Sequence, residues 1–187
     1  MYIVKSPFRI SLFGGSTDYE YFYENNESFI IGTTIDKYVY MSLRKVPEIF
    51  PNHSSFTYSV KEIVLSFDEI KNPLIRETIK YYDVPFNIEF TSFTDVPSRT
   101  GLGGSSSFCI GMCYGIRKLL NLSVDKKQIA KDAIYIERKL LKESGGIQDQ
   151  IWASYGGFNS IHINKAGDFF VKPLPRSEEH TSEIQSH

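Results

Sequence analysis

A glycine- and serine-rich loop is the segment of this chain best suited to chemistry. Between Gly101 and Ser107 the chain places three glycines and three serines, and an apolar periodicity typical of a helix begins immediately afterwards. A glycine-rich loop that leads into a helix leaves backbone N–H groups free and pointing one way. The helix dipole adds roughly half a positive charge at that end, where phosphate commonly binds. The loop therefore predicts an anion site, with a flexible turn before a capped helix as the alternative.

Other familiar site patterns do not occur in the sequence. There is no Gly-Lys-Ser/Thr of a Walker P-loop, and the loop spacing does not match the dinucleotide pattern G-x-G-x-x-G. Cys109 and Cys113 lie four residues apart on the apolar face of the predicted helix, so we interpret them as buried small hydrophobic residues. Without an HExxH or CxxC spacing, a zinc site is not expected.

Composition narrows the class of protein. A chain of 187 residues with 41% hydrophobic content is long enough for one ordinary domain with a core, or for one domain and part of another. Its 21 Lys and Arg against 22 Asp and Glu argue against a nucleic-acid surface. No apolar run approaches the roughly 20 residues that span a bilayer, and the N-terminus lacks the order of a signal peptide. We expect a cytoplasmic protein without a nucleic-acid or membrane partner, and the sequence leaves the oligomeric state open.

The loop must be positioned by the elements that precede it. Residues 68–82 are predicted to be helical, with Pro73 early in its second part, where proline is tolerated. Asp36 and Lys37 read as turn residues between two strands. Stretches rich in β-branched and aromatic residues predict strands at 2–13, 29–35, 37–46, 55–60 and 86–93.

The elements after the loop are predicted to be mostly helical. One helix runs to about Leu120, and Ser123 is a suitable N-cap for the next, which Gly145 and Gly146 end. Glu137 lies at the edge of the buried face of that second helix. A short helix at 148–155 and a strand at 158–163 follow, and this order predicts an α+β domain with a mostly antiparallel sheet and helices on one side. The buried face is formed by Ile129, Ala133, Ile136 and Leu140.

The loop is the second of three motifs that follow one another along the chain: 7–19 (PFRISLFGGSTDY), 97–107 (PSRTGLGGSSS) and 145–157 (GGIQDQIWASYGG). Together they resemble the GHMP small-molecule kinases, which include galactokinase, homoserine kinase and mevalonate kinase. Segments 35–40 and 72–77 and the Gln-Asp-Gln triplet are similar to the branch that acts on D-glycero-D-manno-heptose 7-phosphate. The resemblance covers about residues 3–172.

The resemblance implies a site for ATP and Mg²⁺ at the loop. Ser105 and Glu137 would hold the metal, since magnesium prefers one or two carboxylates together with phosphate oxygens and water. Glu137 could otherwise be a solvated helix charge. Because Gly104 stands where relatives usually have the first serine of a pair, the partition of roles among the three serines stays open. The nucleotide would be bound by Pro97, Gly101, Leu102, Gly103, Gly104, Ser105, Ser106 and Ser107.

The resemblance also implies the residues that act on the substrate. Asp149 would be the general base that accepts the proton of the sugar hydroxyl, or a group that orients it. Arg9 would neutralise charge near Asp149 and the transferred phosphoryl group. Gly15, Ser16 and Asp18 match the sugar-binding turn of the family. The structural alternatives are an exposed cation for Arg9, a helix cap for Asp149 and an ordinary turn residue for Asp18.

The fold implied by the resemblance is a ribosomal-protein-S5 domain 2-like N-terminal domain over residues 1–175, with the ferredoxin-like C-terminal domain of the family largely absent. The implied activity is ATP-dependent phosphorylation of a sugar or sugar phosphate, at the anomeric hydroxyl of D-glycero-D-manno-heptose 7-phosphate. Arg99, Lys37 or Arg76 could supply positive charge for a phosphorylated substrate. The alternatives are a kinase for fucose or galactose, a non-catalytic binding module, for example one for RNA, and an inactive fragment that binds nucleotide.

Residues 176–187 differ in composition from the rest of the chain. They resemble the translation of a DNA-sequencing adapter, apart from Ile184, where leucine would be usual. We interpret them as a non-native tail, with an ordinary polar tail as the alternative. On this interpretation the natural sequence departs from the printed one after Pro175.

Overall fold

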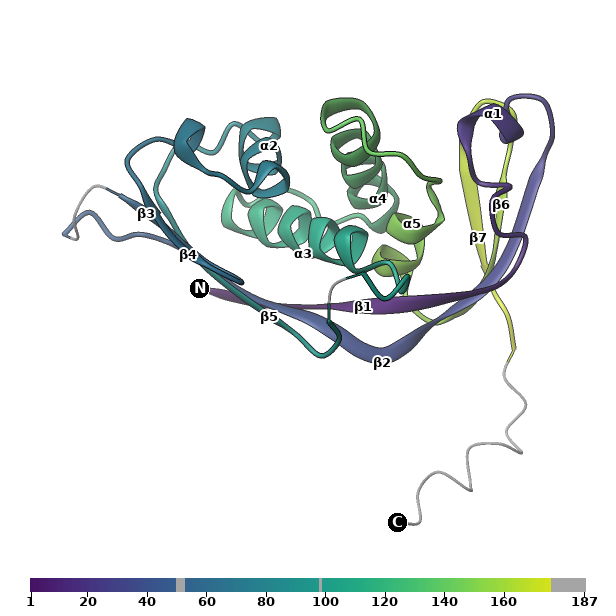
Figure 1. Ribbon diagram of the computed structural model, residues 1–187, viewed down its shortest axis with the longest axis horizontal. Helices are drawn as coiled ribbons and strands as arrows, with labels where there is room; N and C mark the ends of the chain where they lie inside the picture. The colour runs from purple at the N-terminus through teal and green to yellow at the C-terminus, as the bar shows by residue number, and fades with distance from the viewer. Residues whose placement is uncertain (50–52, 98, 176–187) are drawn as a thin grey trace, which may run out of the picture.

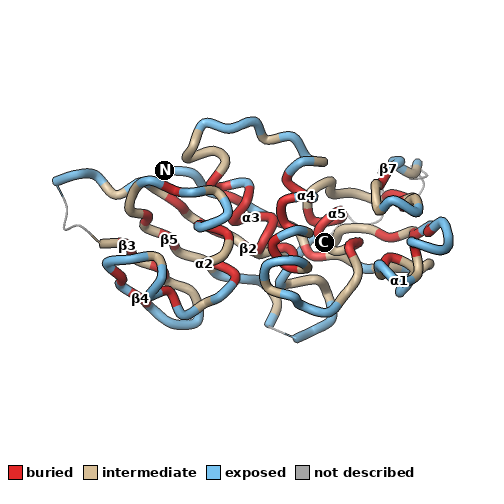
Figure 2. The backbone as a smooth tube through the Cα atoms, turned by 90° about the horizontal axis from the view of Figure 1, so that it is seen from above, coloured by how far each residue is buried: buried red, intermediate tan, exposed pale blue. Residues whose placement is uncertain are grey.

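The computed structural model describes residues 1–49, 53–97 and 99–175, so the predicted tail at 176–187 lies outside the described residues. Figure 1 shows helices α2 to α5 on one face of a curved sheet, and Figure 2 shows the buried residues gathered along α3, α4 and α5. The expected α+β architecture with helices on one side is confirmed. The elements are β1 (Tyr2–Phe13), α1 (Glu20–Tyr23), β2 (Ser28–Lys45), β3 (Ser54–Thr57), β4 (Lys61–Val64), η1 (Phe67–Glu69), α2 (Pro73–Tyr81), β5 (Ile88–Thr94), α3 (Gly104–Leu119), α4 (Lys126–Tyr135), η2 (Ile136–Leu140), α5 (Gln148–Tyr155), β6 (Phe158–Ile163) and β7 (Phe169–Pro173).

The long strand β2 is the element on which the sheet is built. Its C-terminal half pairs with β5 and its N-terminal half with β6, while β1 pairs along the other edge. The described strands form one seven-stranded sheet in the order β4-β3-β5-β2-β6-β7, with β1 beside β2. Only the β3–β5 pairing among them is parallel, so the expected mostly antiparallel sheet is confirmed.

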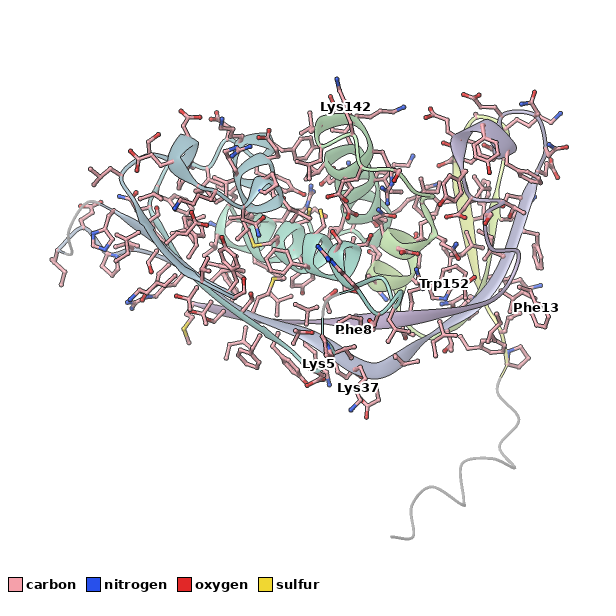
Figure 3. The ribbon with its side chains drawn as sticks, in the orientation of Figure 1. Lys5, Phe8, Phe13, Lys37, Lys142 and Trp152 are labelled. Atoms are coloured by element: carbon pink, nitrogen blue, oxygen red, sulfur yellow. The ribbon has the colours of Figure 1, made fainter. Side chains whose placement is uncertain are left out.

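The two strands predicted at 29–35 and 37–46 are in fact one continuous strand, and Asp36 and Lys37 lie within it rather than in a turn. The register of β1 against β2 shifts between Pro7 and Arg9 and again nearer the end of β1. Such bulges let a long strand pair twist and bend without breaking. Figure 3 shows Lys37 on the face of the sheet away from the helices, where a charged side chain reaches water.

The boundaries of several shorter elements also differ from the prediction. The stretch at 68–82 is divided into the 3₁₀ turn η1 and the helix α2, and α1, β4 and β7 were not predicted. Asp125, and not Ser123, caps α4, because its carboxylate accepts a hydrogen bond from the N–H of Gln128 at 2.8 Å. The carbonyl of Ser123 instead accepts a hydrogen bond from Arg117.

The helix that carries Glu137 ends earlier than predicted, and it ends in a π-helical turn. α4 passes directly into η2, where the N–H of Leu141 donates to the carbonyl of Ile136 at 2.9 Å. Ile136 and Glu137 are both fully buried, whereas Leu140 is 38% exposed. Three predictions are therefore wrong: that Leu140 is buried, that Glu137 lies at the edge of the buried face, and that Gly145 ends the helix. The wider π-helical turn rotates the side chains away from the positions that a 3.6-residue period predicts. Such turns are frequent at functional sites.

The core lies between the sheet and the helices. Figure 3 shows Phe8 and Trp152 in this layer, and both are buried. Helix α3 approaches β2 closely through glycine, since a Cβ at Gly115 would lie only 2.6 Å from Cδ1 of Leu43. The interpretation of the two cysteines as buried small hydrophobic residues is confirmed, because both are free thiols without solvent exposure.

A buried carboxylate joins the helices that lead to the site. Asp132 on α4 accepts hydrogen bonds from Tyr81 at 3.0 Å and from Tyr82 at 2.5 Å, both at the end of α2. It also accepts from Arg117 on α3 and from Gln128 on α4, each at 2.8 Å. Burial and the nearby Asp132 carboxylate raise the pKa of Tyr81 to about 12. This cluster fixes α4, and with it the start of η2, against α2 and α3.

We expect Asp132→Ala to lower the free energy of unfolding by about 3–5 kcal/mol, because it removes one partner of a buried ion pair and leaves Arg117 uncompensated. Asp125→Ala removes an exposed helix cap on the same helix and should cost about 1 kcal/mol. Urea denaturation followed by circular dichroism measures both losses. Equal losses would contradict a structural role for the Asp132 cluster.

Candidate active site

A cleft of about 930 Å³ opens beside the N-terminus of α3. One wall comes from the glycine-serine loop, and another comes from the start of α2. Glu137 and Asp149 reach the same cleft from η2 and α5. Most residues of the predicted nucleotide site therefore line one cavity: Pro97, Gly101, Gly103, Gly104, Ser105 and Ser106.

The loop lies directly against the predicted catalytic residues. Gly103 precedes α3 in the left-handed region with φ of 77°, which favours glycine. A Cβ there would lie 3.2 Å from Cγ of Arg9 and 3.4 Å from Oδ2 of Asp149. Any larger residue would thus be strained and would crowd both side chains. The free N–H groups at the start of α3 give this end of the cleft the positive partial charge that an anion requires.

Arg9 and Asp149 form a two-point ion pair at the centre of the site. Nε of Arg9 donates to Oδ1 of Asp149 at 2.7 Å, and Nη2 donates to Oδ2 at 2.6 Å. Nη1 donates to the carbonyl of Gly101 at 2.9 Å, and the backbone N–H of Arg9 donates to the carbonyl of Leu102 at 3.2 Å. The side chains of Arg9 and Asp149 are only 14% and 23% exposed. Arg9 is therefore not a free surface cation, because it joins β1, the loop and α5.

Glu137 is held between the loop and α5. The hydroxyl of Ser105 donates to Oε1 of Glu137 at 3.0 Å, and the amide of Gln150 donates to Oε2 at 2.5 Å. Burial raises the pKa of the Glu137 carboxyl, while the hydrogen bond from Gln150 and the charge of Arg138 oppose that shift. A solvated helix charge is excluded for Glu137, because the residue has no exposed surface.

The three loop serines have different surroundings. The hydroxyl of Ser107 donates to the carbonyls of Pro7 at 2.7 Å and Gly103 at 3.0 Å, and the residue is fully buried. Ser105 and Ser106 both line the cleft. Of the three loop serines, these two therefore share the lining of the cleft with Glu137.

The predicted substrate turn contacts the site through α5 rather than by lining the cleft. Asp18 is 1% exposed, and its two carboxylate oxygens accept the backbone N–H and the side-chain amide of Gln148 at 3.0 and 3.1 Å. Burial raises the pKa of Asp18. Ser16 adopts φ of 69° in the same turn, and a Cβ added at Gly15 would meet no atom within 4 Å. Among the described residues that line the cleft, none of these three appears.

The structure adds contacts for residues to which the sequence assigned no role. Gln148 and Gln150, which the sequence marked only as part of the Gln-Asp-Gln triplet, each donate a hydrogen bond to one buried carboxylate. Arg138 lines the cleft and binds the following segment, with Nε donating to the carbonyl of Gly146 at 3.1 Å. Of the cations suggested for a substrate phosphate, Arg99 lines the cleft. The guanidinium of Arg76 instead contacts Glu77 and the carbonyl of Ile70.

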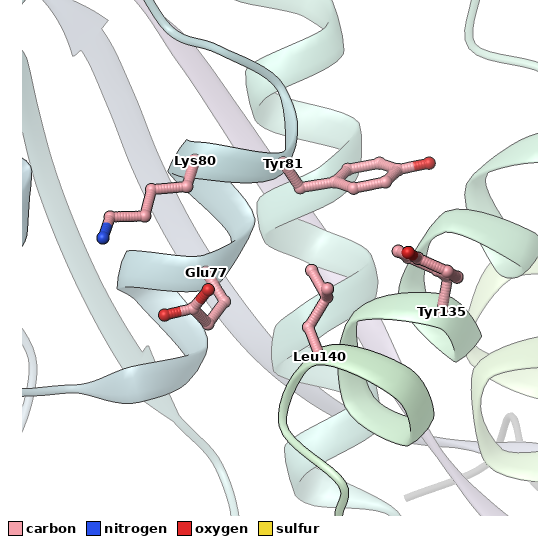
Figure 4. Close-up of a pocket in the computed structure, with 5 residues that line it drawn as sticks. All are labelled: Glu77, Lys80, Tyr81, Tyr135 and Leu140. Atoms are coloured by element: carbon pink, nitrogen blue, oxygen red, sulfur yellow. The ribbon is translucent and has the colours of Figure 1, made fainter.

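A second, smaller hollow of about 450 Å³ lies between α2 and the end of α4 with η2. Figure 4 shows the aromatic ring of Tyr81 above Leu140 and that of Tyr135 beside it, with Glu77 and Lys80 on the opposite side. It is lined by none of the predicted site residues, so the candidate chemistry is concentrated in the larger cleft. In the described ranges, no helix is long and apolar enough to cross a membrane.

Comparison with known sequences places this geometry in a family. Residues 69–157 match the GHMP kinases N terminal domain. The D-glycero-alpha-D-manno-heptose 7-phosphate kinase of Campylobacter jejuni is 31% identical over 194 residues, covering 97% of this chain and 56% of that protein. A galactokinase of Pyrococcus furiosus is 29% identical over 162 residues, covering 84% of this chain and 45% of that protein. The chain thus spans about half the length of the curated relatives it matches.

Solved structures share the fold. A D-glycero-D-manno-heptose 1-phosphate kinase from Bacteriodes thetaiotaomicron superposes with a TM-score of 0.86 at 25% identity, covering 95% of this chain and 61% of that one. Lactococcus lactis galactokinase shares the fold with a TM-score of 0.73 at 15% identity, covering 96% of this chain and 52% of that one. The matched family segment includes the loop, Glu137 and Asp149. By its sequence over residues 69–157 and by its fold, this chain carries a GHMP kinase N-terminal domain.

Proposed function

We propose that the protein is an ATP-dependent kinase for a sugar or sugar phosphate, with residues 1–175 as its N-terminal domain. The observation that carries this proposal is the Arg9–Asp149 pair, which lies against the glycine loop and whose Asp149 lines the same cleft as Ser105 and Glu137. Phosphoryl transfer needs an anion site, an aligned hydroxyl and charge stabilisation, and these residues supply one group for each requirement.

The nucleotide would bind with its phosphates at the loop and the start of α3. Glu137 and Ser105 offer hard oxygen donors 3.0 Å apart in the cleft lining, which suits Mg²⁺. No group of three or more His, Cys, Asp or Glu side chains suited to a metal occurs in the described part of the chain. The remaining ligands would therefore be phosphate oxygens and water, as magnesium commonly takes them. When bound, the metal would neutralise charge on the transferred phosphoryl group.

Asp149 is the group that we assign to the sugar hydroxyl. The hydroxyl oxygen bonds to the γ-phosphorus of ATP, the bond from that phosphorus to the bridging oxygen breaks, ADP leaves, and the hydroxyl proton passes to Asp149. Both carboxylate oxygens already accept bonds from Arg9, but a carboxylate has about four lone-pair sites, so capacity for the proton remains. Arg9 fixes the plane of the carboxylate, and its positive charge lies beside the loop where phosphate charge would develop.

The substrate that we propose is D-glycero-D-manno-heptose 7-phosphate, phosphorylated at the anomeric hydroxyl. Its support is the Campylobacter jejuni relative, which is named as a heptose 7-phosphate kinase. The similar Bacteriodes thetaiotaomicron structure is named for a heptose 1-phosphate. Arg99 in the cleft lining offers positive charge for a substrate phosphate. Galactose is the second candidate, favoured by the galactokinases among the relatives.

We expect Asp149→Asn to lower kcat by about 10²- to 10⁴-fold, the usual contribution of a general base. Asp168→Asn is a matched control, because Asp168 pairs with Lys127 and Lys131 and does not line the cleft. The measurement is ADP release by the protein as encoded by its full gene, with ATP, Mg²⁺ and the heptose 7-phosphate.

The same assay with heptose 1-phosphate, galactose and fucose separates the substrates. Transfer to galactose alone would select the second candidate. Full activity of the Asp149 variant would remove that residue from the chemistry. RNA binding by a protein that transfers no phosphate would replace the kinase with a binding module.

Gly146→Ala tests the link between the substrate turn and α5. A Cβ at Gly146 would lie 1.7 Å from Oδ2 of Asp18, so the carboxylate and the first turn of α5 must move apart. We expect a loss of about 1–3 kcal/mol in stability, as for other overpacked sites, together with a higher KM for the sugar. Gly15→Ala meets no atom within 4 Å and should change stability by less than about 0.5 kcal/mol. Thermal denaturation of both variants is the measurement, and an unchanged Gly146→Ala protein would contradict the predicted clash.

A further inference from the structure

The first turn of α5 directs three consecutive side chains to three different partners. Gln148 donates to Asp18 at 3.1 Å, Asp149 accepts from Arg9 at 2.6 Å, and Gln150 donates to Glu137 at 2.5 Å. Successive residues on a helix point about 100° apart, which lets one turn reach the substrate turn, β1 and η2 together. The two glutamines thus hold carboxylates on opposite sides of Asp149.

Gln150 determines the orientation of the Glu137 carboxylate in the cleft. Both residues are fully buried, so the carboxylate exchanges no hydrogen bonds with bulk water. Its Oε2 accepts from Gln150, and its Oε1 accepts from Ser105. A buried charge needs such donors, because burial without them is costly. With Oε2 occupied, the carboxylate plane is set and Oε1 faces the loop.

The side-chain carbonyl oxygen of Gln150 is unpaired among the described residues, and this indicates the role of the side chain. Within the described part of the chain, Oε1 of Gln150 is buried and has no hydrogen-bond partner. Buried polar groups are nearly always paired, so an unpaired one calls for an explanation. The amide is oriented to serve Glu137 and leaves its own carbonyl unsatisfied. An apolar residue of similar size would fill the space without that cost, but it would leave Oε2 of Glu137 without a donor.

We propose that Gln150 is a positioning residue that holds Glu137 for the Mg²⁺–nucleotide complex, while Gln148 does the same for Asp18 on the substrate side. This inference rests on the proposed kinase function. It predicts that the two glutamines, two residues apart on one helix, affect different ligands.

Gln150→Met and Gln148→Met form a matched pair, because each replaces an amide with an unbranched apolar side chain of similar length. The direct readout is Mn²⁺ affinity in the presence of a non-hydrolysable ATP analogue, measured by electron paramagnetic resonance on the full-length protein. We expect Gln150→Met to weaken Mn²⁺ binding by about 10- to 100-fold and Gln148→Met to change it by less than about twofold, since loss of a group that orients a metal ligand commonly has the larger effect. In the kinase assay, Gln150→Met should raise the Mg²⁺ concentration needed for half-maximal rate, and Gln148→Met should raise the KM for the sugar.

Circular dichroism and thermal melting establish that each variant is folded. If Gln150→Met does not fold, Gln150→Asn keeps the amide but is one methylene too short to reach Glu137, and the same loss of Mn²⁺ affinity is expected. Unchanged Mn²⁺ affinity in a folded Gln150 variant would overturn the proposal, as would equal losses in both methionine variants, which would indicate a general disturbance of α5. If Gln150→Met weakens Mn²⁺ binding in a protein whose wild type transfers no phosphate, the positioning role stands and the proposed kinase function fails.

Discussion

The ion pair between Arg9 and Asp149 is the interaction on which the arrangement of the site depends. It joins residues 140 positions apart, one on β1 and one on α5, and Arg9 also binds the carbonyl of Gly101. Because three elements meet at one guanidinium, the loop can approach only if Gly103 carries no side chain. Opposite charges with two parallel hydrogen bonds set direction as well as distance. The start of α3 is thereby kept facing the carboxylate of Asp149.

The burial of carboxylates is the main free-energy cost of forming this site, and hydrogen bonds from the first turn of α5 offset that cost. Burial raises the pKa of both Asp18 and Glu137, which reflects the penalty of removing a charge from water. Gln148 donates to one carboxylate and Gln150 to the other. The separate Asp132 network secures α4, the helix that leads into η2 and Glu137, against α2 and α3. This network orients groups rather than simply filling space.

Much of the site could be predicted from the sequence, but its details could not. The loop, Arg9, Glu137 and Asp149 were all singled out, and they meet in one cleft or along its wall. Their catalytic and binding roles stay predictions. The continuity of β2 was missed because Asp36 and Lys37 read locally as a turn, whereas β2 carries them as extra residues where its register against β1 shifts. The π-helical turn was missed because hydrophobic periodicity assumes 3.6 residues per turn.

The sequence by itself determined the local features of this protein and its resemblance to a family. Glycines and serines before an apolar helix make the loop, and three ordered motifs indicate the GHMP kinases, whose N-terminal domain matches residues 69–157. Only the tertiary structure decided that Ser107 is committed to backbone carbonyls, that Glu137 is fully buried, and that Gln150 supports it. The physical reason is that these properties arise from hydrogen bonds between segments distant in the chain. The periodicity of apolar residues indicates which face of a helix or strand is apolar. It does not indicate which polar group from another element contacts that helix or strand.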